Sequence, residues 1–496
     1  MTSFAKRAFH GAIAVIILGM VSNFLAYVLR LVLARSLPKE DFGLFYSVVA
    51  LVGLLYILTH LGLNDALSRH ISASRVKGDI SSIKAAIYSV MGIQLILAII
   101  VVAIIATISP WLSKNYFHHA GAALVLIIQS SGMILLPFET LYLSVFQGYQ
   151  EMGWYGSVNL IRMASVVIFS IVYLWLGLGV LSPALAYLSW YFIAILIYSQ
   201  VVFRRLLPGF FRADYVISRD LVTGLFAFGL PVIFSSFAGV IVSYTDTIML
   251  TWLRGSLEEV AIYNVALPTA SILWFFSAGL AIVLFPITSE LWERKYHDHL
   301  REGIELVYRY AFMLITPLAL ALSVFPETVI VTLFGPGFEA GAPVLRLLSI
   351  GAILFTFGRV NEAFFSGMGE PKTNFRIICA GAIANLLLNI AFVPKFGMMG
   401  AASATVISFG VIFGMGLYSI RKRIDFHVPW SGWARIAVSG AVFLSVLTWF
   451  KNVLPLPVWP KIIIGTLMAF AIYVAVLLVL RAVTIKEIKT QLSRVM

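Results

Sequence analysis

Long apolar segments dominate this chain and leave it very few possible folds. From His10 almost to Arg481, hydrophobic runs of roughly twenty or more residues follow one another with short polar breaks. Each run is long enough to cross the bilayer core as a helix, in which the backbone polar groups pair internally. The mean hydropathy of +0.98 and the 11% of charged residues are outside the range of soluble proteins. We therefore expect an all-α polytopic membrane protein.

The distribution of lysine and arginine predicts how the chain crosses the membrane. We place about fourteen transmembrane helices, the number for which basic residues alternate between rich and poor loops. The rich loops, with Arg75 and Arg204 among their residues, are then cytoplasmic, and the poor ones, such as that of Lys114, are outside. This predicts a protein of the cell (cytoplasmic) membrane with both termini in the cytoplasm. The net charge of +13 follows from this bias and suits anionic membrane lipids; without a soluble basic domain we expect no nucleic-acid binding.

Three stretches of the first half of the chain recur in the second half. The pairs are FQGYQEMGWYG at Phe146 with FSGMGEPKTNF at Phe365, LGLGVLSPALA at Leu176 with PKFGMMGAASA at Pro394, and RSLPKEDFGLFYS at Arg35 with GSLEEVAIYNV at Gly255. In the second pair Gly179 aligns with Gly397. Each half holds an even number of spans, so both halves start on the same side of the membrane. The sequence therefore predicts two parallel repeats, as in alternating-access transporters.

These repeats divide the chain into three parts. Residues 1–206 form an N-terminal six-helix lobe, and residues 207–424 form a C-terminal six-helix lobe. The basic segment 204–220 links the two lobes and is expected on the inner membrane surface. Residues 425–496 have no counterpart in the repeat and are expected to form an extra two-helix hairpin and a cytoplasmic tail.

The chain lacks the usual signatures of an enzyme. No predicted loop is long enough to hold a catalytic domain, and there is no GxxxxGKS/T phosphate-binding loop. The close pair His118 and His119 has no further metal ligands nearby. We therefore expect a transporter with no catalytic residue, no metal site and no cofactor, although a coupling ion (H⁺ or Na⁺) is possible for such a protein.

Charged residues inside spans cost about 2.5–3.5 kcal/mol each and usually mark a functional cavity. Arg30 lies toward the outer end of the first span, and Asp246 lies at a similar depth in the seventh. A pair between them across the two lobes would relieve both burial costs. Two alternatives stay open: Arg30 extends to the outer headgroups, or Asp246 binds the coupling ion.

A second group of charges lies nearer the cytoplasm. Glu139 is in the fourth span, Arg162 in the fifth, and Arg359 and Glu362 in the tenth. The fourth and tenth spans are equivalent in the two repeats, so we expect these charges to converge on one substrate-binding cavity. Alternatively, Arg359 and Glu362, three residues apart, pair along their own helix.

Motifs along the whole chain carry a family resemblance. LARSLPKEDFGLFYSVVAL, LGLNDALSRHISA, GLPVIFSSFAGVIVSYTDTIML, LFGPGFEAGAPVLRLLSIG and FSGMGEPKTN occur in this order. They resemble the polysaccharide-transporter branch of the multidrug/oligosaccharidyl-lipid/polysaccharide exporter superfamily. The resemblance implies a flippase that moves lipid-linked oligosaccharide across the membrane for surface polysaccharide (such as lipopolysaccharide) biosynthesis, alongside a polymerase and glycosyltransferases. It also implies two lobes that open alternately to each side.

The chemistry of the span charges suits this substrate. Arginines in a cavity can bind the diphosphate of a lipid-diphosphate-linked oligosaccharide through charge-assisted hydrogen bonds. The main alternative is a cation-coupled multidrug or small-molecule antiporter of the same superfamily, for which an acid-rich cavity is expected. A third is a non-transporting membrane scaffold, in which every buried charge is paired across a dry lobe interface.

Overall fold

The computed structural model describes residues 2–453, 455 and 457–483, with the backbone alone at 2–10, 231, 234–238 and 458. Every regular element among these residues is helical, and twelve of the helices are long and apolar enough to cross a membrane. The predicted all-α membrane fold is therefore confirmed. The predicted number of fourteen spans is not confirmed, and the predicted tail beyond residue 483 lies outside the described residues.

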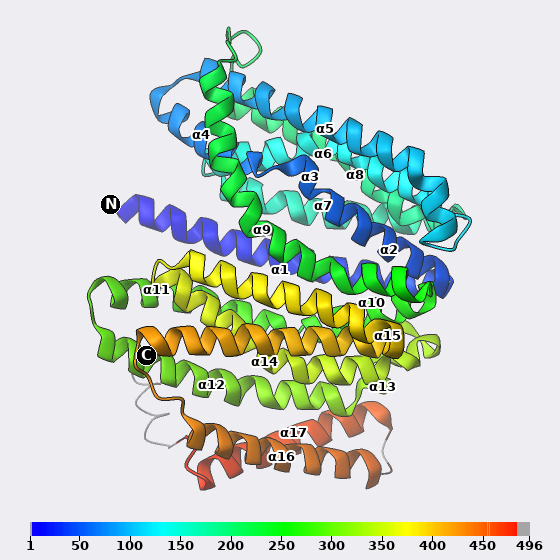
Figure 1. Cartoon of the computed structure of the whole chain (residues 1–496), viewed down its shortest axis with the longest axis vertical. Helices are drawn as coiled ribbons and strands as arrows, with labels where there is room; N and C mark the ends of the chain where they lie inside the picture. Colours follow the sequence, from blue (N-terminus) through cyan, green and yellow to red (C-terminus); the bar gives the residue numbers. More distant parts are fainter. Residues whose placement is uncertain (1, 454, 456, 484–496) are drawn as a thin grey trace. The chain divides into compact units, whose positions relative to one another are not determined.

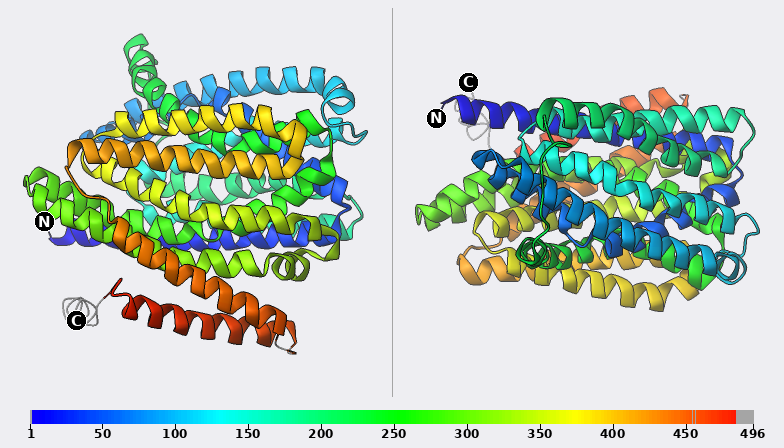
Figure 2. Two further views of the ribbon diagram at one scale, coloured as in Figure 1. Left: turned by 60° about the horizontal axis from the view of Figure 1, so that its bottom comes forward. Right: turned by 90° about the horizontal axis from the view of Figure 1, so that it is seen from above.

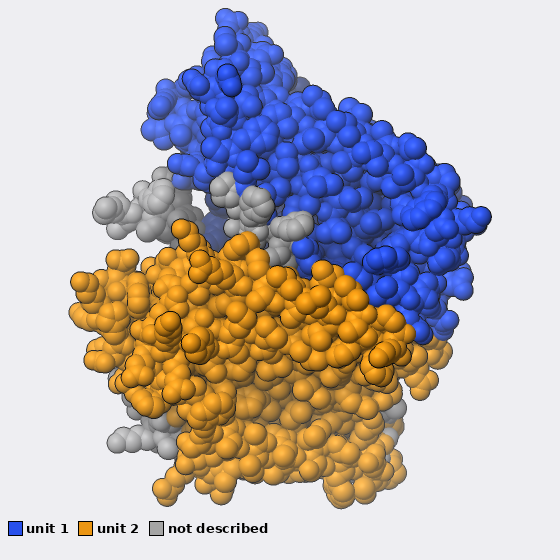
Figure 3. All heavy atoms as spheres, in the orientation of Figure 1, with its two compact units in different colours: residues 1–261 blue, residues 262–496 orange. Residues whose placement is uncertain are grey.

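The chain forms two compact units, residues 1–261 and 262–496 (Figure 3). The helices of unit 1 are α1 (Thr2–Ser36), α2 (Lys39–Leu55), α3 (Ile57–His60), α4 (Leu63–Lys77), α5 (Ile80–Asn115), α6 (Ala122–Gly148), α7 (Met152–Trp175), α8 (Leu181–Gln200), the π-helical turn Val201–Leu206 and α9 (Arg219–Arg254). This division falls after the predicted repeat boundary at 206, because α9 packs on α2 and α4. The repeat boundary itself stays a prediction.

Unit 1 has an apolar core where α2, α5, α6 and α8 meet. Leu44, Val48, Val125 and Ala184 are among its fully buried side chains. The opposite face of α5 exposes a row of isoleucines that includes Ile96, as expected for a helix in contact with lipid.

Helices α2 and α9 approach each other through small and polar residues. Ser47 Oγ and Thr251 Oγ1 are 2.8 Å apart and both side chains are fully buried. A Cβ atom at Gly43 of α2 would lie 1.9 Å from the carbonyl oxygen of Leu257, which begins the helix after α9, so only glycine allows α2 to come this close to the segment that follows α9. Since α2 belongs to the first sequence repeat and α9 to the second, this contact joins the two repeats.

Unit 2 consists of α11 (Trp274–Glu293), α12 (His297–Val324), α13 (Pro326–Phe334), the 3₁₀ helix Pro336–Gly341, α14 (Ala342–Gly367), α15 (Pro371–Arg423), α16 (Trp430–Val453) and α17 (Val458–Val479); α10 (Leu257–Ser271) crosses the division between the units. Helix α14 packs on α11, α12 and α15, with Tyr308, Phe357 and Phe365 buried between them. Helix α15 is two helices that meet at Gly397.

The C-terminal hairpin of α16 and α17 packs on α12 of unit 2 (Figures 1 and 2). The hydroxyl of Tyr473 donates to the carbonyl oxygen of Met313 at 2.8 Å, and Phe443 and Leu447 are buried beside it. The predicted two-helix hairpin is thus present among the described residues.

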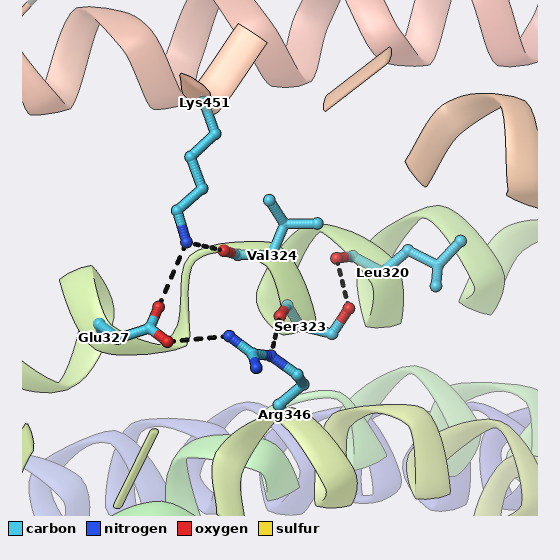
Figure 4. Close-up of polar contacts among 6 residues, drawn as sticks. All are labelled: Leu320, Ser323, Val324, Glu327, Arg346 and Lys451. Atoms are coloured by element: carbon cyan, nitrogen blue, oxygen red, sulfur yellow. Dashed lines mark hydrogen bonds and ion pairs between the residues drawn. The ribbon is translucent and has the colours of Figure 1, made fainter. Parts of the chain in front are cut away.

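An ion-pair network also holds the end of α16 to α13 (Figure 4). Lys451 Nζ donates to Val324 O at 2.8 Å and lies 3.3 Å from Glu327 Oε2. Arg346 Nη2 lies 2.8 Å from Glu327 Oε1. Burial alone would raise the pKa of Glu327, but a hydrogen bond from its own backbone and the two cations outweigh burial and hold the pKa below its usual value. Glu327 therefore carries its charge at neutral pH.

The sequence repeats fold into matching turns. Between α6 and α7, Gln150 has φ of 61° and Glu151 N–H donates to Phe146 O at 2.8 Å. Between α14 and α15, Gly369 has φ of 71° and Glu370 N–H donates to Phe365 O at 2.8 Å.

The aligned glycines of the second repeat pair agree in the same way. Gly179 has φ of 52° and Gly397 has φ of 55°. These values lie in the left-handed region, which glycine enters without steric cost. The predicted duplication is therefore visible in the backbone.

A buried lysine holds the segment that follows the first repeat. Lys84, which is 6% exposed, donates to the carbonyl oxygens of Ala213 at 2.7 Å and Phe211 at 3.2 Å. Its ammonium group also lies 5.1 Å from the ring of Tyr215 and 5.7 Å from that of Phe210. Hydrogen bonds and aromatic faces replace the water that this cation loses.

Candidate functional site

A break in a helix shapes the polar part of unit 1. Helix α3 ends at His60, and α4 begins at Leu63. Between them Leu61 and Gly62 are left-handed, with φ of 46° and 64°. A Cβ atom at Gly62 would lie 2.2 Å from the carbonyl oxygen of Gly229 on α9, so both the backbone angle and the close approach require glycine. Backbone groups freed by such a break must find other partners.

Side chains from neighbouring helices supply those partners. Gln94 of α5 donates to His60 O at 3.3 Å and to Asn64 Oδ1 at 3.0 Å. Ser144 of α6 donates to Asn64 O at 3.1 Å. The His60 ring nitrogen Nε2 lies 2.8 Å from Asn64 Nδ2. The break is therefore a polar cluster inside a mainly apolar bundle.

A buried ion pair lies beside this break. Arg162 Nη1 of α7 donates to Glu139 Oε1 of α6 at 2.9 Å. Trp190 Nε1 of α8 donates to Glu139 Oε2 at 2.7 Å, and Arg162 Nη2 donates to Asn159 Oδ1 at 2.6 Å. Glu139 is 2% exposed, whereas the Arg162 side chain is 33% exposed. The carboxylate is thus enclosed, whereas about a third of the Arg162 side chain remains exposed.

The helix break and the ion pair line one cavity, which we call the unit 1 chamber. Its volume is about 370 Å³, and its walls include Tyr56, His60, Asn64, Asp65, Glu139, Thr140, Gln147, Tyr155 and Arg162. Arg162 supplies a fixed positive charge, and amide and hydroxyl groups surround it. Such an arrangement can bind an oxyanion through charge-assisted hydrogen bonds. A cavity of this size accommodates a diphosphate group, although not a whole glycan.

The structure places the six predicted site residues as follows. Glu139 and Arg162 come together in the unit 1 chamber. Arg359 and Glu362 form an ion pair along α14 in unit 2, with side chains 38% and 32% exposed. This is the local pairing given above as an alternative to a shared cavity. Convergence of the fourth and tenth spans on one cavity stays a prediction.

The two predicted outer charges both lie in unit 1. Arg30 of α1 has its guanidinium carbon 4.0 Å from the centre of the Tyr46 ring. Asp246 of α9 is 3% exposed. Stacking on an aromatic face lowers the cost of burying Arg30 without removing its charge. The predicted Arg30–Asp246 pair stays a prediction.

We expect mutual rescue if Arg30 and Asp246 pair during the transport cycle. Arg30→Ala and Asp246→Ala should each lose most transport, because each leaves the other charge buried, and the double variant should regain part of it. Transport by the four proteins of this double-mutant cycle, measured at equal amounts in the membrane, checks this. A double variant as inactive as Asp246→Ala would instead favour a coupling-ion site at Asp246. Strictly additive losses would mean that the two residues never meet.

Several residues that line the chamber or hydrogen-bond to its ion pair were not predicted from the sequence. They are His60, Asn64, Asp65, Asn159 and Trp190. A glycine followed by two polar residues, in Leu61-Gly62-Leu63-Asn64-Asp65, is a signal for a broken membrane helix that could have revealed the first three. Trp190 carries no such signal, because a tryptophan in an apolar run is equally typical of a lipid-facing or a packed position. Among the described residues, no three metal-binding side chains come close enough to hold an ion.

Comparison with protein-family models gives two matches. Residues 8–292 match the family described as polysaccharide biosynthesis protein, and residues 232–470 match the family described as lipid II flippase MurJ. An uncharacterized membrane protein of Methanocaldococcus jannaschii is 31% identical over 95% of both chains. A probable low-salt glycan biosynthesis flippase of Haloferax volcanii, Agl15, is 24% identical over 90% of both chains.

Solved structures show the same fold at low sequence identity. The lipid II flippase MurJ in an inward closed conformation aligns with a TM-score of 0.74 and 15% identity, covering 94% of this chain and 98% of that chain. An inward-facing multidrug resistance MATE family transporter aligns with a TM-score of 0.66 and 18% identity, covering 83% of this chain and 98% of that chain.

Proposed function

We propose that the unit 1 chamber binds the substrate of this protein. The premise is that the chain belongs to the polysaccharide biosynthesis protein family and is a membrane flippase of lipid-linked glycans rather than an enzyme. The observation that carries the proposal is the partly exposed Arg162 side chain in the wall of a polar chamber. A lipid-linked glycan presents sugars that cannot cross hydrocarbon unaided, so the protein must offer a polar path.

In this proposal Arg162 binds a phosphate of the group that joins the lipid to the glycan. The name lipid II flippase, carried by a relative and by the matching family model, supports a lipid-linked substrate of this type. The diphosphate then lies in the chamber, and the larger glycan extends beyond its 370 Å³. Arg359 is proposed to bind the same group from unit 2 at another stage, when its pair with Glu362 opens.

Reconstitution of the purified full chain tests this function. In liposomes that contain a fluorescent lipid-diphosphate-oligosaccharide, the labelled lipid should cross from one leaflet to the other at a rate that increases with the amount of protein. The same lipid with a neutral linkage in place of the diphosphate should move at least about tenfold more slowly, since one charge-assisted hydrogen bond is worth about 1.5–3 kcal/mol. Equal rates for both lipids would contradict the diphosphate assignment. Export of a cationic dye in place of the lipid would support the antiporter alternative.

We also propose that both termini lie in the cytoplasm, with glycosyltransferases that build the glycan on that side and a polymerase that uses it on the other. The basic loops support this orientation. Single cysteines at Lys114 and Lys372, in a variant with Cys379→Ser, should react with an impermeant thiol reagent from opposite sides of the membrane. Lys114→Cys should react in intact cells and Lys372→Cys only after the membrane is opened. Labelling of both from one side would show the orientation to be wrong.

A further inference from the structure

The negative charge of Glu139 depends on a single cation. Of its two carboxylate oxygens, one accepts from Arg162 and the other accepts from the uncharged indole of Trp190. At 2% exposure, the Glu139 side chain is almost fully enclosed by protein, and it borders the chamber over a small area. A buried carboxylate that loses its charged partner takes up a proton rather than stay ionised. The protonation of Glu139 is therefore tied to the position of the Arg162 guanidinium.

Arg162 has the freedom to take a second anion. Its side chain is 33% exposed, and it lines the unit 1 chamber together with Glu139. Its Nε–H is buried and makes no hydrogen bond within the described structure, whereas Nη2 is held by Asn159 at 2.6 Å. A phosphate offers several oxygens to a guanidinium and a larger charge than a carboxylate. A phosphate that enters the chamber therefore competes with Glu139 for Arg162.

We propose that a phosphate bound at Arg162 displaces Glu139, and that Glu139 then takes up one proton from the water of the chamber. The inference rests on the proposed function, because the phosphate is that of the lipid-linked glycan. The proton adds to the carboxylate oxygen that Arg162 leaves, and the other oxygen still accepts from Trp190. When the phosphate departs, Arg162 pairs with Glu139 again and the proton is released. The chamber thus binds an anionic group and H⁺ together.

Other titratable groups face Glu139 from the surrounding helices. They are Tyr56 between α2 and α3, His60 of α3, Asp65 of α4, Tyr155 and Arg162 of α7, and Tyr191 and Tyr198 of α8. Tyrosine ordinarily titrates near pH 10, and Asp65, unlike Glu139, is exposed to solvent. His60 is the one neighbour in this set that ordinarily titrates near neutrality. The test must therefore separate Glu139 from His60.

Titration calorimetry with inorganic diphosphate measures the proton directly. The purified full chain is titrated at pH 7 in two buffers of different ionisation enthalpy, so that the difference in heat gives the protons taken up per diphosphate. We expect wild type to take up about one proton more per diphosphate than Glu139→Gln. His60 and the protons of the ligand are the same in both proteins, so the difference comes from Glu139. Glu139→Gln should also bind diphosphate about tenfold or more tightly, since Arg162 no longer has a competing carboxylate. Glu139→Asp keeps an ionisable group and should retain the proton uptake.

Two results separate this inference from the function on which it rests. Equal proton uptake by wild type and Glu139→Gln, with tight binding in both, would overturn the proton coupling and leave the chamber as a phosphate site. Equal diphosphate affinity in wild type and Arg162→Ala would overturn the phosphate site itself, and the coupling with it. Proton uptake that persists in Glu139→Gln but disappears in His60→Gln would assign the proton to His60 and contradict the role of Glu139.

Discussion

Alanine in place of Arg162 is expected to reduce glycolipid flipping to the rate of protein-free liposomes. The change removes the cation of the unit 1 chamber and leaves Glu139 buried without its charged partner, and breaking a buried pair in this way costs about 3–5 kcal/mol. Lysine should restore flipping only in part, because an ammonium group cannot form the paired hydrogen bonds of a guanidinium. Arg359→Ala is expected to have the same effect in unit 2. The measurement is the reconstituted flipping assay at equal protein content.

The control for these variants is Arg294→Ala. Arg294 also pairs with a glutamate, Glu290 at 2.8 Å, but its side chain is 60% exposed and lies outside the chamber. An exposed pair of this kind contributes little, so flipping should stay near the wild-type rate. Size-exclusion profiles of all variants separate loss of transport from loss of fold. Normal flipping by the Arg162→Ala and Arg359→Ala double variant would disprove the assignment.

A disulfide between cysteines at Ser47 and Thr251 is expected to stop transport completely. These side chains, 2.8 Å apart, join α2 of the first repeat to α9 of the second. Alternating access requires the repeats to separate at one end at a time, so a covalent link there fixes one state. The two cysteine sulfur atoms would replace hydroxyl oxygens that lie 2.8 Å apart, and a disulfide requires them to approach to about 2.0 Å. The variants are made with Cys379→Ser, oxidised with a membrane-permeant reagent and assayed before and after reduction.

A second buried pair provides a matched control. Ser277 Oγ and Thr356 Oγ1 are 2.7 Å apart and join α11 to α14 inside unit 2. Cysteines at these two positions should crosslink equally well and leave transport intact, because both helices belong to the second repeat. Transport that continues through the Ser47–Thr251 crosslink would show that α2 and α9 stay together throughout the cycle.

The sequence predicted the helices and the duplication because both leave local signals. Apolar runs of membrane length identify the spans, and the FQG and FSG motifs anticipate turns that the structure shows to share φ values and hydrogen bonds. The exact number of spans was less accessible. In α15 two helices meet at Gly397 within one continuous helical segment, as the repeat that aligns Gly397 with Gly179 anticipates, so helix length alone does not give the number of crossings.

The candidate site was predictable only in part. Glu139 and Arg162 were selected as unusual charges within spans, and their pairing requires the packing of α6 on α7, which no local pattern determines. Arg359 and Glu362 pair along α14 as their spacing allows. Trp190 completes the site from a third helix. Its role depends on the direction of one N–H group, which the sequence does not encode locally.

The position of the groups that bind Lys84 has a consequence for the synthesis of the protein. Lys84 lies near the start of α5, whereas the carbonyl groups that receive its ammonium belong to residues 211 and 213, which leave the ribosome well over a hundred residues later. The first six long helices must therefore enter the membrane while this cation still lacks its final partners. Arrival of the connecting segment closes that gap just as the first repeat is complete. When synthesis of the second repeat begins, the carbonyl groups that bind the Lys84 ammonium group have therefore already been made.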